Sequence, residues 1–133
     1  MIKLVKVILP CTRQQKVDFY FWVENDNNPV AEYIYGVQEE EQNKLIDFLA
    51  SVAVEGIPWH NQVQCKKIHK YKNQYELKRK PHRVAFHEIG SGATLVLTEA
   101  WRKQETSKKN DPHYARADRR WQAYLEQKDA KGA

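Results

Sequence analysis

Three short segments with strand character follow one another between residues 74 and 101, and they constrain the fold more than any other feature. They cover residues 74–80, 83–89 and 94–101, with Pro81-His82 in the first gap and Gly90-Ser91-Gly92 in the second. Gaps of this length and composition join antiparallel neighbours, so the pattern predicts a meander. Residues 95–97 are apolar without alternation, which indicates a central strand covered on both faces.

The rest of the chain predicts two more strands and three helices. Residues 3–9 and the aromatic run 17–23 are typical of strands, whereas residues 29–35 and 38–53 have helical periodicity. Asn110 or Asp111 is expected to cap a final helix that has Pro112 in its first turn. The expected fold class is α+β: a twisted, mostly antiparallel sheet with N-terminal helices and a C-terminal helix packed on it.

Length and composition favour one globular unit without a membrane segment. The 133 residues suit a single domain, 1–133, whose tail at about 128–133 is expected to fray. The longest apolar run is far short of the ~20 residues that span a bilayer, and no secretion signal is visible, so we expect a cytoplasmic protein that makes no membrane contact. Cys11 and Cys65 are then expected to be reduced. His60, Cys65 and His69 lack the spacing of a zinc site, so we expect neither a metal nor another cofactor.

Charge is distributed unevenly along the chain. The formal net charge is +5, but residues 24–55 carry eight acids against Lys44, whereas residues 66–83 carry eight bases against Glu76. Residues 102–120 add seven bases against three acids. Positive potential therefore gathers in the second half of the chain, where a polyanion such as nucleic acid is the natural partner.

Blocks between residues 74 and 125 resemble, in order, toxins of the RelE/ParE superfamily, especially its HigB-like and phage-derived branches. Residues 75–78 (Tyr-Glu-Leu-Lys) are similar to the family's Tyr-Glu-Leu-Arg strand, and residues 83–87 (Arg-Val-Ala-Phe-His) to its Arg-Val-x-Phe/Tyr-Tyr strand. Residues 95–103 resemble a strand ending in an aromatic and a basic pair, and residues 111–119 the closing helix. The resemblance spans residues 17–126, which leaves residues 1–10 as an extra N-terminal strand.

The resemblance implies a toxin of a type II toxin-antitoxin system that acts as a ribosome-dependent mRNA endoribonuclease without a metal. The implied partners are the ribosome with its mRNA and a cognate antitoxin, often of helix-turn-helix type. Such cleavage needs a proton acceptor for the ribose 2′-hydroxyl, positive charge around the phosphate, and a proton for the leaving 5′-oxygen. The candidate catalytic residues are Lys78, Arg83, Arg102 and Lys103 for charge, with His87 or Tyr75 for proton transfer. Lys78 stands where arginine is usual, so it would contact phosphate as a point charge.

Strand alternation places Arg83 and His87 on one face of their strand, so both can face the same concavity. His87 can equally be a packed histidine with no catalytic part. Tyr75 and Trp101, the latter standing where phenylalanine is usual, are suited to stacking on an unpaired base, or to filling the core.

Two further groups of bases are candidates for RNA binding. We expect ribosome docking at a basic, loop-like stretch that includes His69 and Tyr71, namely Lys66, Lys67, Lys70 and Lys72. Arginines of the last helix, Arg116, Arg119 and Arg120, are expected to bind RNA phosphates or the acids of a partner, or to form an ordinary solvated helix face.

Two other functions fit the same sequence. One is a ParE-like toxin that inhibits DNA gyrase by binding, and the other is an inactive, phage-derived nucleic-acid-binding protein. A cluster of catalytic side chains on the concave sheet face favours the nuclease, because a gyrase inhibitor has no need to bring Arg83, His87 and Lys103 together.

Overall fold

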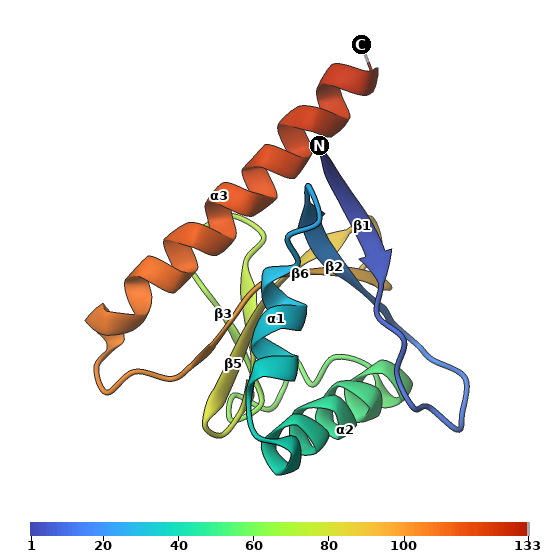
Figure 1. Cartoon of the computed structure of the whole chain (residues 1–133), viewed down its shortest axis with the longest axis vertical. Coiled ribbons are helices and arrows are strands. Elements are labelled where there is room, and N and C mark those ends of the chain that lie inside the picture. Colours follow the sequence, from blue (N-terminus) through green and yellow to red (C-terminus); the bar gives the residue numbers. More distant parts are fainter. Residues whose placement is uncertain (133) are drawn as a thin grey trace.

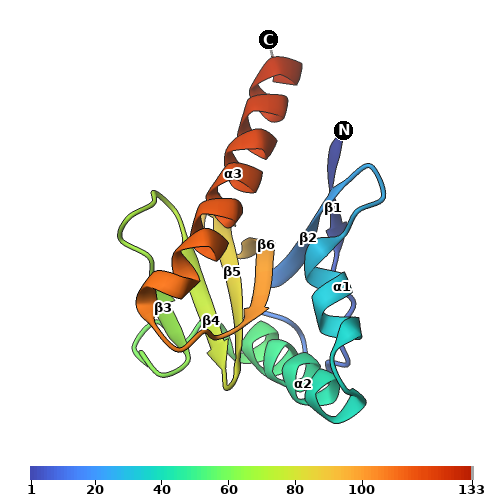
Figure 2. The ribbon, with the colours of Figure 1, turned by 60° about the vertical axis from the view of Figure 1, so that its left-hand side comes forward.

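A computed structural model describes residues 1–132, and in it helices cover both faces of one twisted sheet (Figures 1 and 2). In chain order the elements are β1 (Ile2–Lys6), β2 (Asp18–Glu24), α1 (Pro29–Gly36), α2 (Glu39–Glu55), β3 (Cys65–Lys67), β4 (Tyr75–Arg79), β5 (His82–Ile89), β6 (Thr94–Arg102) and α3 (Ser107–Gly132). The α+β class predicted from the sequence is confirmed.

The six strands lie in the order β1-β2-β6-β5-β4-β3. The pairs β1–β2, β6–β5, β5–β4 and β4–β3 are antiparallel, and β2 pairs with β6 in parallel, with Asp18 opposite Thr94. The sheet is therefore mixed but mostly antiparallel, as predicted. The predicted meander forms β4, β5 and β6, and β6 lies inside the sheet with both faces covered.

One face of the sheet is buried beneath α1 and α2. Apolar side chains of these helices, including Ile34, Leu45 and Leu49, pack on Phe19 and Phe86 from the strands. The helical period of the leucines and the period of two in the strands bring both sets to this interface. Asn28 caps α1 by accepting from the backbone N–H of Ala31 at 3.1 Å.

The opposite face carries α3, which runs obliquely across β5 and β6 and extends beyond the sheet (Figure 1). Ala117 and Trp121 of α3 pack on Ala85, Val96 and Trp101 of the strands. The register between β5 and β6 shifts after Ala85: this residue lies opposite Glu99, whereas Phe86 lies opposite Leu97. This bulge leaves Thr98 as an extra residue in β6, and both Thr98 and Glu99 bond to groups on the α3 side.

Sequence and structure differ at the first strand, which ends at Lys6 rather than at residue 9, at the start of the final helix and at β3. The final helix starts at Ser107 rather than at Asn110 or Asp111, because Asn110 holds the end of β6 instead of capping a helix. Pro112 consequently lies inside α3. Lys66 and Lys67, predicted to lie in a loop-like stretch, belong instead to the edge strand β3, which pairs with β4. Finally, α3 continues to Gly132; fraying of its end stays a prediction, and Ala133 lies outside the described residues.

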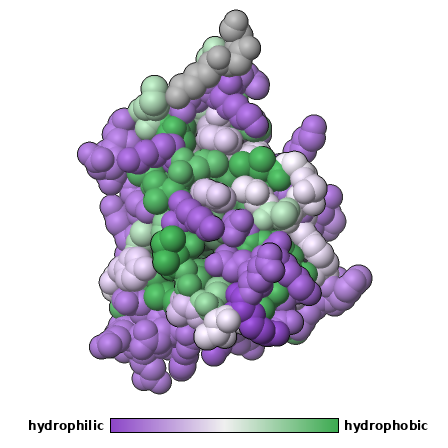
Figure 3. Space-filling view, turned by 90° about the vertical axis from the view of Figure 1, so that its right-hand side faces the viewer, coloured by the Kyte–Doolittle hydropathy of each residue, from purple (hydrophilic) through white to green (hydrophobic). Residues whose placement is uncertain are grey.

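The first strand forms the other edge of the sheet. Figure 3 shows apolar residues gathered across the middle of that side of the molecule. Val5 in β1 and Ile8 just after it are exposed apolar side chains. Lys3 and Lys6 lie on the same edge and oppose pairing with another sheet, since charged edges disfavour such contacts. In the described part of the chain no helix is long and apolar enough to span a membrane.

Candidate anion-binding pocket

A pocket of about 450 Å³ lies on the α3 side of the sheet, lined by residues of β3, β4 and β5 and of the first turns of α3. Figure 2 shows how these elements are arranged. Its lining contains six bases against two acids, Glu76 and Asp111. The bases come from three separate parts of the chain, and they are Lys66, Lys67, Lys70, Lys78, Arg83 and Lys103. Three of the six predicted catalytic residues, Lys78, Arg83 and Lys103, are therefore brought together.

Strand geometry explains why these side chains meet. Lys78 of β4 lies directly opposite Arg83 of β5, and Glu76 lies opposite Lys66 of β3. Residues two apart on a strand share a face, so Glu76 and Lys78 both point toward α3. Lys103 follows the end of β6, where its backbone N–H donates to the carbonyl of Pro81 at 2.8 Å. The pocket floor is thus built on regular strands, which bring Glu76, Lys78 and Arg83 together.

The bases of the pocket form no close ion pairs within the described part of the protein. Among the described residues, none of the six takes part in an ion pair within 4.0 Å. Arg83 is only 9% exposed. Burying a cation without a partner is costly, so the arrangement favours an anion that enters from outside. Burial also lowers the pKa of Lys78, which makes its ammonium group a better proton donor than a free lysine.

The buried carboxylate of Glu76 lies among these cations and was missed by the sequence analysis. Tyr114 of α3 donates its hydroxyl hydrogen to Glu76 Oε2 at 2.7 Å. Burial, and then the hydrogen bond to Glu76, raise the pKa of Tyr114, so its phenol stays protonated and remains the donor. Glu76 is the one acid among eight bases in residues 66–83, and a single acid in so basic a stretch is the sequence feature that could have identified it as a candidate site residue.

The shared concavity predicted for Arg83 and His87 is wrong, although the two do lie on the same face of β5. His87 is fully buried, and its ring stacks on Trp121 of α3 with 4.9 Å between ring centroids. The ring also bonds to the carbonyl of Asn73 and the hydroxyl of Thr98, each at 2.8 Å. Burial lowers the pKa of His87 to about 3, so the ring is neutral at physiological pH. Helix α3 lines the pocket with Tyr114, and about two turns later its Trp121 covers His87.

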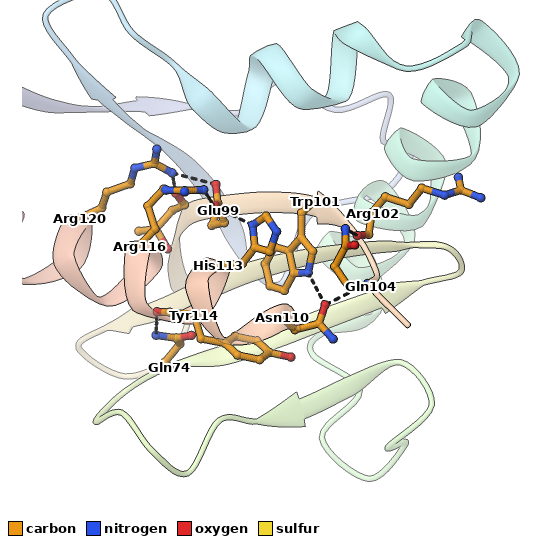
Figure 4. A network of polar contacts seen from close by, with 11 residues as sticks. Gln74, Glu99, Trp101, Arg102, Gln104, Asn110, His113, Tyr114, Arg116 and Arg120 are labelled. Atoms are coloured by element: carbon orange, nitrogen blue, oxygen red, sulfur yellow. Dashed lines mark hydrogen bonds and ion pairs between the residues drawn. The ribbon is translucent and has the colours of Figure 1, made fainter. Parts of the chain in front are cut away.

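Trp101 is also unavailable to RNA. The side chain is 3% exposed, and its ring stacks on His113 with 4.9 Å between centroids. Its Nε1–H donates to Asn110 Oδ1 at 3.0 Å, and the same oxygen accepts from the backbone N–H of Gln104 at 3.1 Å (Figure 4). The core-filling alternative for Trp101 is therefore correct, and the ring fixes α3 above the end of β6.

Arg102 lies on the other side of the sheet from its neighbour Lys103. Figure 4 shows Arg102 extending toward α2 and away from the residues of α3. There its positive charge favours the ionised forms of Tyr33 and Glu41. Both side chains hydrogen-bond to the buried ring of His82, Tyr33 at 2.6 Å and Glu41 at 3.1 Å. This predicted catalytic residue is consequently not part of the pocket.

Tyr75 also faces away from the pocket, because it alternates with Glu76 along β4. Its ring stacks on Phe86 with 5.4 Å between centroids and meets Trp59 edge to face at 5.1 Å. Tyr75 lines a separate hollow of about 350 Å³ on the α2 side of the sheet edge. Tyr75 is therefore not placed to transfer a proton in the basic pocket.

The predicted RNA-binding groups divide between the pocket and other surfaces. Lys66, Lys67 and Lys70 line the pocket, whereas Lys72 is exposed outside it. Arg119 is exposed on α3. The other two arginines of α3 hold the buried carboxylate of Glu99, as Figure 4 shows: Arg116 Nη1 lies 2.7 Å from Oε2 and Arg120 Nη1 lies 2.9 Å from Oε1.

The described residues hold no group of three or more histidines, cysteines or acids that could bind a metal ion. Comparison with known proteins found no matching family model and no curated protein of significant similarity.

Proposed function

We propose that this protein is an RNA-cleaving toxin of a type II toxin-antitoxin system, and that it binds the scissile phosphate in the basic pocket. The observation that carries the proposal is the convergence of Lys78, Arg83 and Lys103 around the carboxylate of Glu76, with none of the three bases in an ion pair within 4.0 Å among the residues that the structure describes. The bases of the pocket outnumber its two acids, so an RNA phosphodiester can supply further negative charge, and its cleavage also needs a proton acceptor.

The chemistry follows from the positions of the charged groups. Arg83 binds the non-bridging phosphate oxygens and Lys103 adds to the positive charge, which stabilises the phosphorane as its negative charge grows. Glu76 takes the proton of the ribose 2′-hydroxyl as that oxygen attacks phosphorus. Lys78 gives a proton to the leaving 5′-oxygen, aided by its lowered pKa. The products are a 2′,3′-cyclic phosphate and a free 5′-hydroxyl, with Tyr114 holding the carboxylate in place.

The cellular setting of the proposal is the translating ribosome in the cytoplasm. Lys70 on the rim of the pocket, with the exposed Lys72 and Arg119 beyond it, is suited to binding phosphates of ribosomal RNA. A cognate antitoxin would neutralise the toxin by covering the same charges with its acids. We propose the ribosome and the antitoxin as partners because of the sequence resemblance, whereas we propose anion binding because of the bases in the pocket.

The test is to map transcript ends after the protein is induced in cells, on translated and untranslated copies of one message. We expect new ends within the translated copy alone. Lys103→Ala should lower cleavage by about 100-fold or more, the usual loss when one charge-stabilising donor is removed. Arg102→Ala is the matched control, because it removes the same charge from the adjacent residue on the opposite face. Equal effects of the two substitutions would contradict the proposed site.

Glu76→Gln separates chemistry from binding. Glutamine keeps an oxygen that accepts from Tyr114, but it cannot take a proton from the ribose hydroxyl. Cleavage should be lost, while RNA binds at least as tightly because a negative charge has left the pocket. Growth arrest with gyrase inhibited and without new RNA ends would instead support the gyrase-inhibiting alternative.

A further inference from the structure

A second hollow adjoins the basic pocket at the edge of the sheet. It has a volume of about 350 Å³ and lies on the α2 side, where Trp59, Cys65 and Tyr75 line it. Lys66, Lys67 and His69 line both hollows. Because β3 is the edge strand, these three side chains form a continuous rim around the edge from one hollow to the other.

The register of the edge strand explains how one rim serves two hollows. Lys66 pairs with Glu76, which faces the basic pocket, and Lys67 pairs with Tyr75, which faces the second hollow. Successive residues of a strand point to opposite faces, so the two lysines stand on either side of β3. The short strand β3 therefore supplies lining residues to both hollows.

The second hollow has uncharged, aromatic walls. Trp59 is 46% exposed, whereas the other three tryptophans are buried in the protein. Burial raises the pKa of Cys65 to about 11 and also raises that of Tyr75, so both groups remain neutral at physiological pH. The ring of Trp59 stands nearly perpendicular to that of Tyr75, at 72°, which leaves a corner of two aromatic surfaces.

We propose that this hollow binds an unpaired nucleobase of the RNA strand whose phosphate occupies the basic pocket. Aromatic corners with basic rims are a common way to bind single-stranded nucleic acid, because every base has a face that stacks while lysines neutralise the backbone. Gln62 in the wall supplies an amide that can bond to the edge of the base. The proposal rests on the proposed function, and it makes Trp59 a binding residue of that site.

The test measures the affinity of the intact protein for a fluorescent single-stranded octauridylate, and for a series of octamers that each carry one abasic ribose. Trp59→Ala should weaken binding of octauridylate about 5- to 150-fold, the range found when a stacking aromatic is removed. Trp59→Phe should restore most of the affinity. Tyr35→Ala is the matched control, since Tyr35 is also an exposed aromatic residue, 60% accessible, but lies in α1.

The abasic series keeps the test independent of protein stability. One abasic position should lower the affinity of the wild-type protein by a similar factor, and should have no further effect on Trp59→Ala. If Lys103→Ala weakens binding of every octamer while neither the abasic positions nor Trp59→Ala does, the base site is refuted and the phosphate pocket stands. If neither substitution changes RNA binding, both proposals fail.

Discussion

Acid should destabilise this fold through His87. The ring is fully buried between the sheet and α3, where it stacks on Trp121. Nδ1 faces the carbonyl of Asn73 and therefore carries the hydrogen, which leaves Nε2 to accept from the hydroxyl of Thr98. Both nitrogens of the neutral ring are thus satisfied. A second proton would place a charge in an apolar layer and would remove the acceptor used by Thr98.

The size of the effect follows from the difference in pKa between the two states. Burial lowers the pKa of His87 to about 3 in the folded protein, against an ordinary value near 6.5 in the unfolded chain. The unfolded chain therefore binds the proton first, and stability falls as the pH drops below about 6.5, down to about 3. Between pH 7.5 and pH 5 this group alone should cost about 2 kcal/mol, since each unit of difference is worth about 1.4 kcal/mol.

Urea denaturation of wild type and His87→Gln at both pH values measures the effect. At pH 7.5 the variant should be less stable by about 1–3 kcal/mol, because a buried hydrogen bond and a stacked ring are lost. By pH 5 that difference should shrink by about 2 kcal/mol, because glutamine does not titrate. His60→Gln, at an exposed histidine, should keep the wild-type loss. An equal loss of stability in wild type and His87→Gln would refute the reasoning.

Three further predictions concern the neighbouring networks and the pocket. Asn110→Ala should lower the free energy of unfolding by about 2 kcal/mol, because it leaves an indole N–H buried without an acceptor. Glu99→Gln should cost about 2 kcal/mol, less than a fully buried ion pair, because one of its two arginine partners is well exposed. Lys103→Ala should make RNA binding less dependent on salt. The slope of log K against log[salt] should fall in magnitude by about 0.7, which is the contribution of one phosphate contact on a single strand.

Each of these has a neighbouring control. Asp111→Ala and Glu126→Gln change exposed residues of the same helix and should alter the free energy of unfolding by no more than about 0.5 kcal/mol. Arg102→Ala should leave the salt slope unchanged. A stability loss at Asp111 as large as at Asn110, or an equal fall in slope for Arg102 and Lys103, would contradict the assigned contacts.

Periodicity in the sequence predicted the elements because it records which face of each is buried. The meander, its central third strand and the common face of Arg83 and His87 all follow from alternation along β5 and β6. Alternation does not reveal which element covers a face. It therefore could not show that Arg83, at one end of β5, lines a pocket, whereas His87, at the other end, lies beneath α3. The same limit applied to Trp101, whose partner His113 is supplied by the helix.

Departures from regular geometry were also beyond prediction. The bulge at Thr98 directs two consecutive side chains toward α3, which a strict period of two does not allow. Asn110 is a common helix cap in sequence terms, but here the indole of Trp101 takes its side-chain oxygen. Trp59 lies in a loop without periodicity, so only its contacts with Tyr75 and Phe86 indicate its place.

The parallel pairing of β2 with β6 has a consequence for how the chain acquires its fold during synthesis. Asp18 meets Thr94 across this junction, so the first hairpin stays separate from the rest of the sheet until the ribosome has made residues beyond 94. Until then Phe19 and Phe21 lack the strand that completes their layer. Contacts this distant along the chain slow folding. We therefore expect the apolar side chains of the N-terminal half to stay exposed, and to be bound by chaperones, until the final third of the chain has been made.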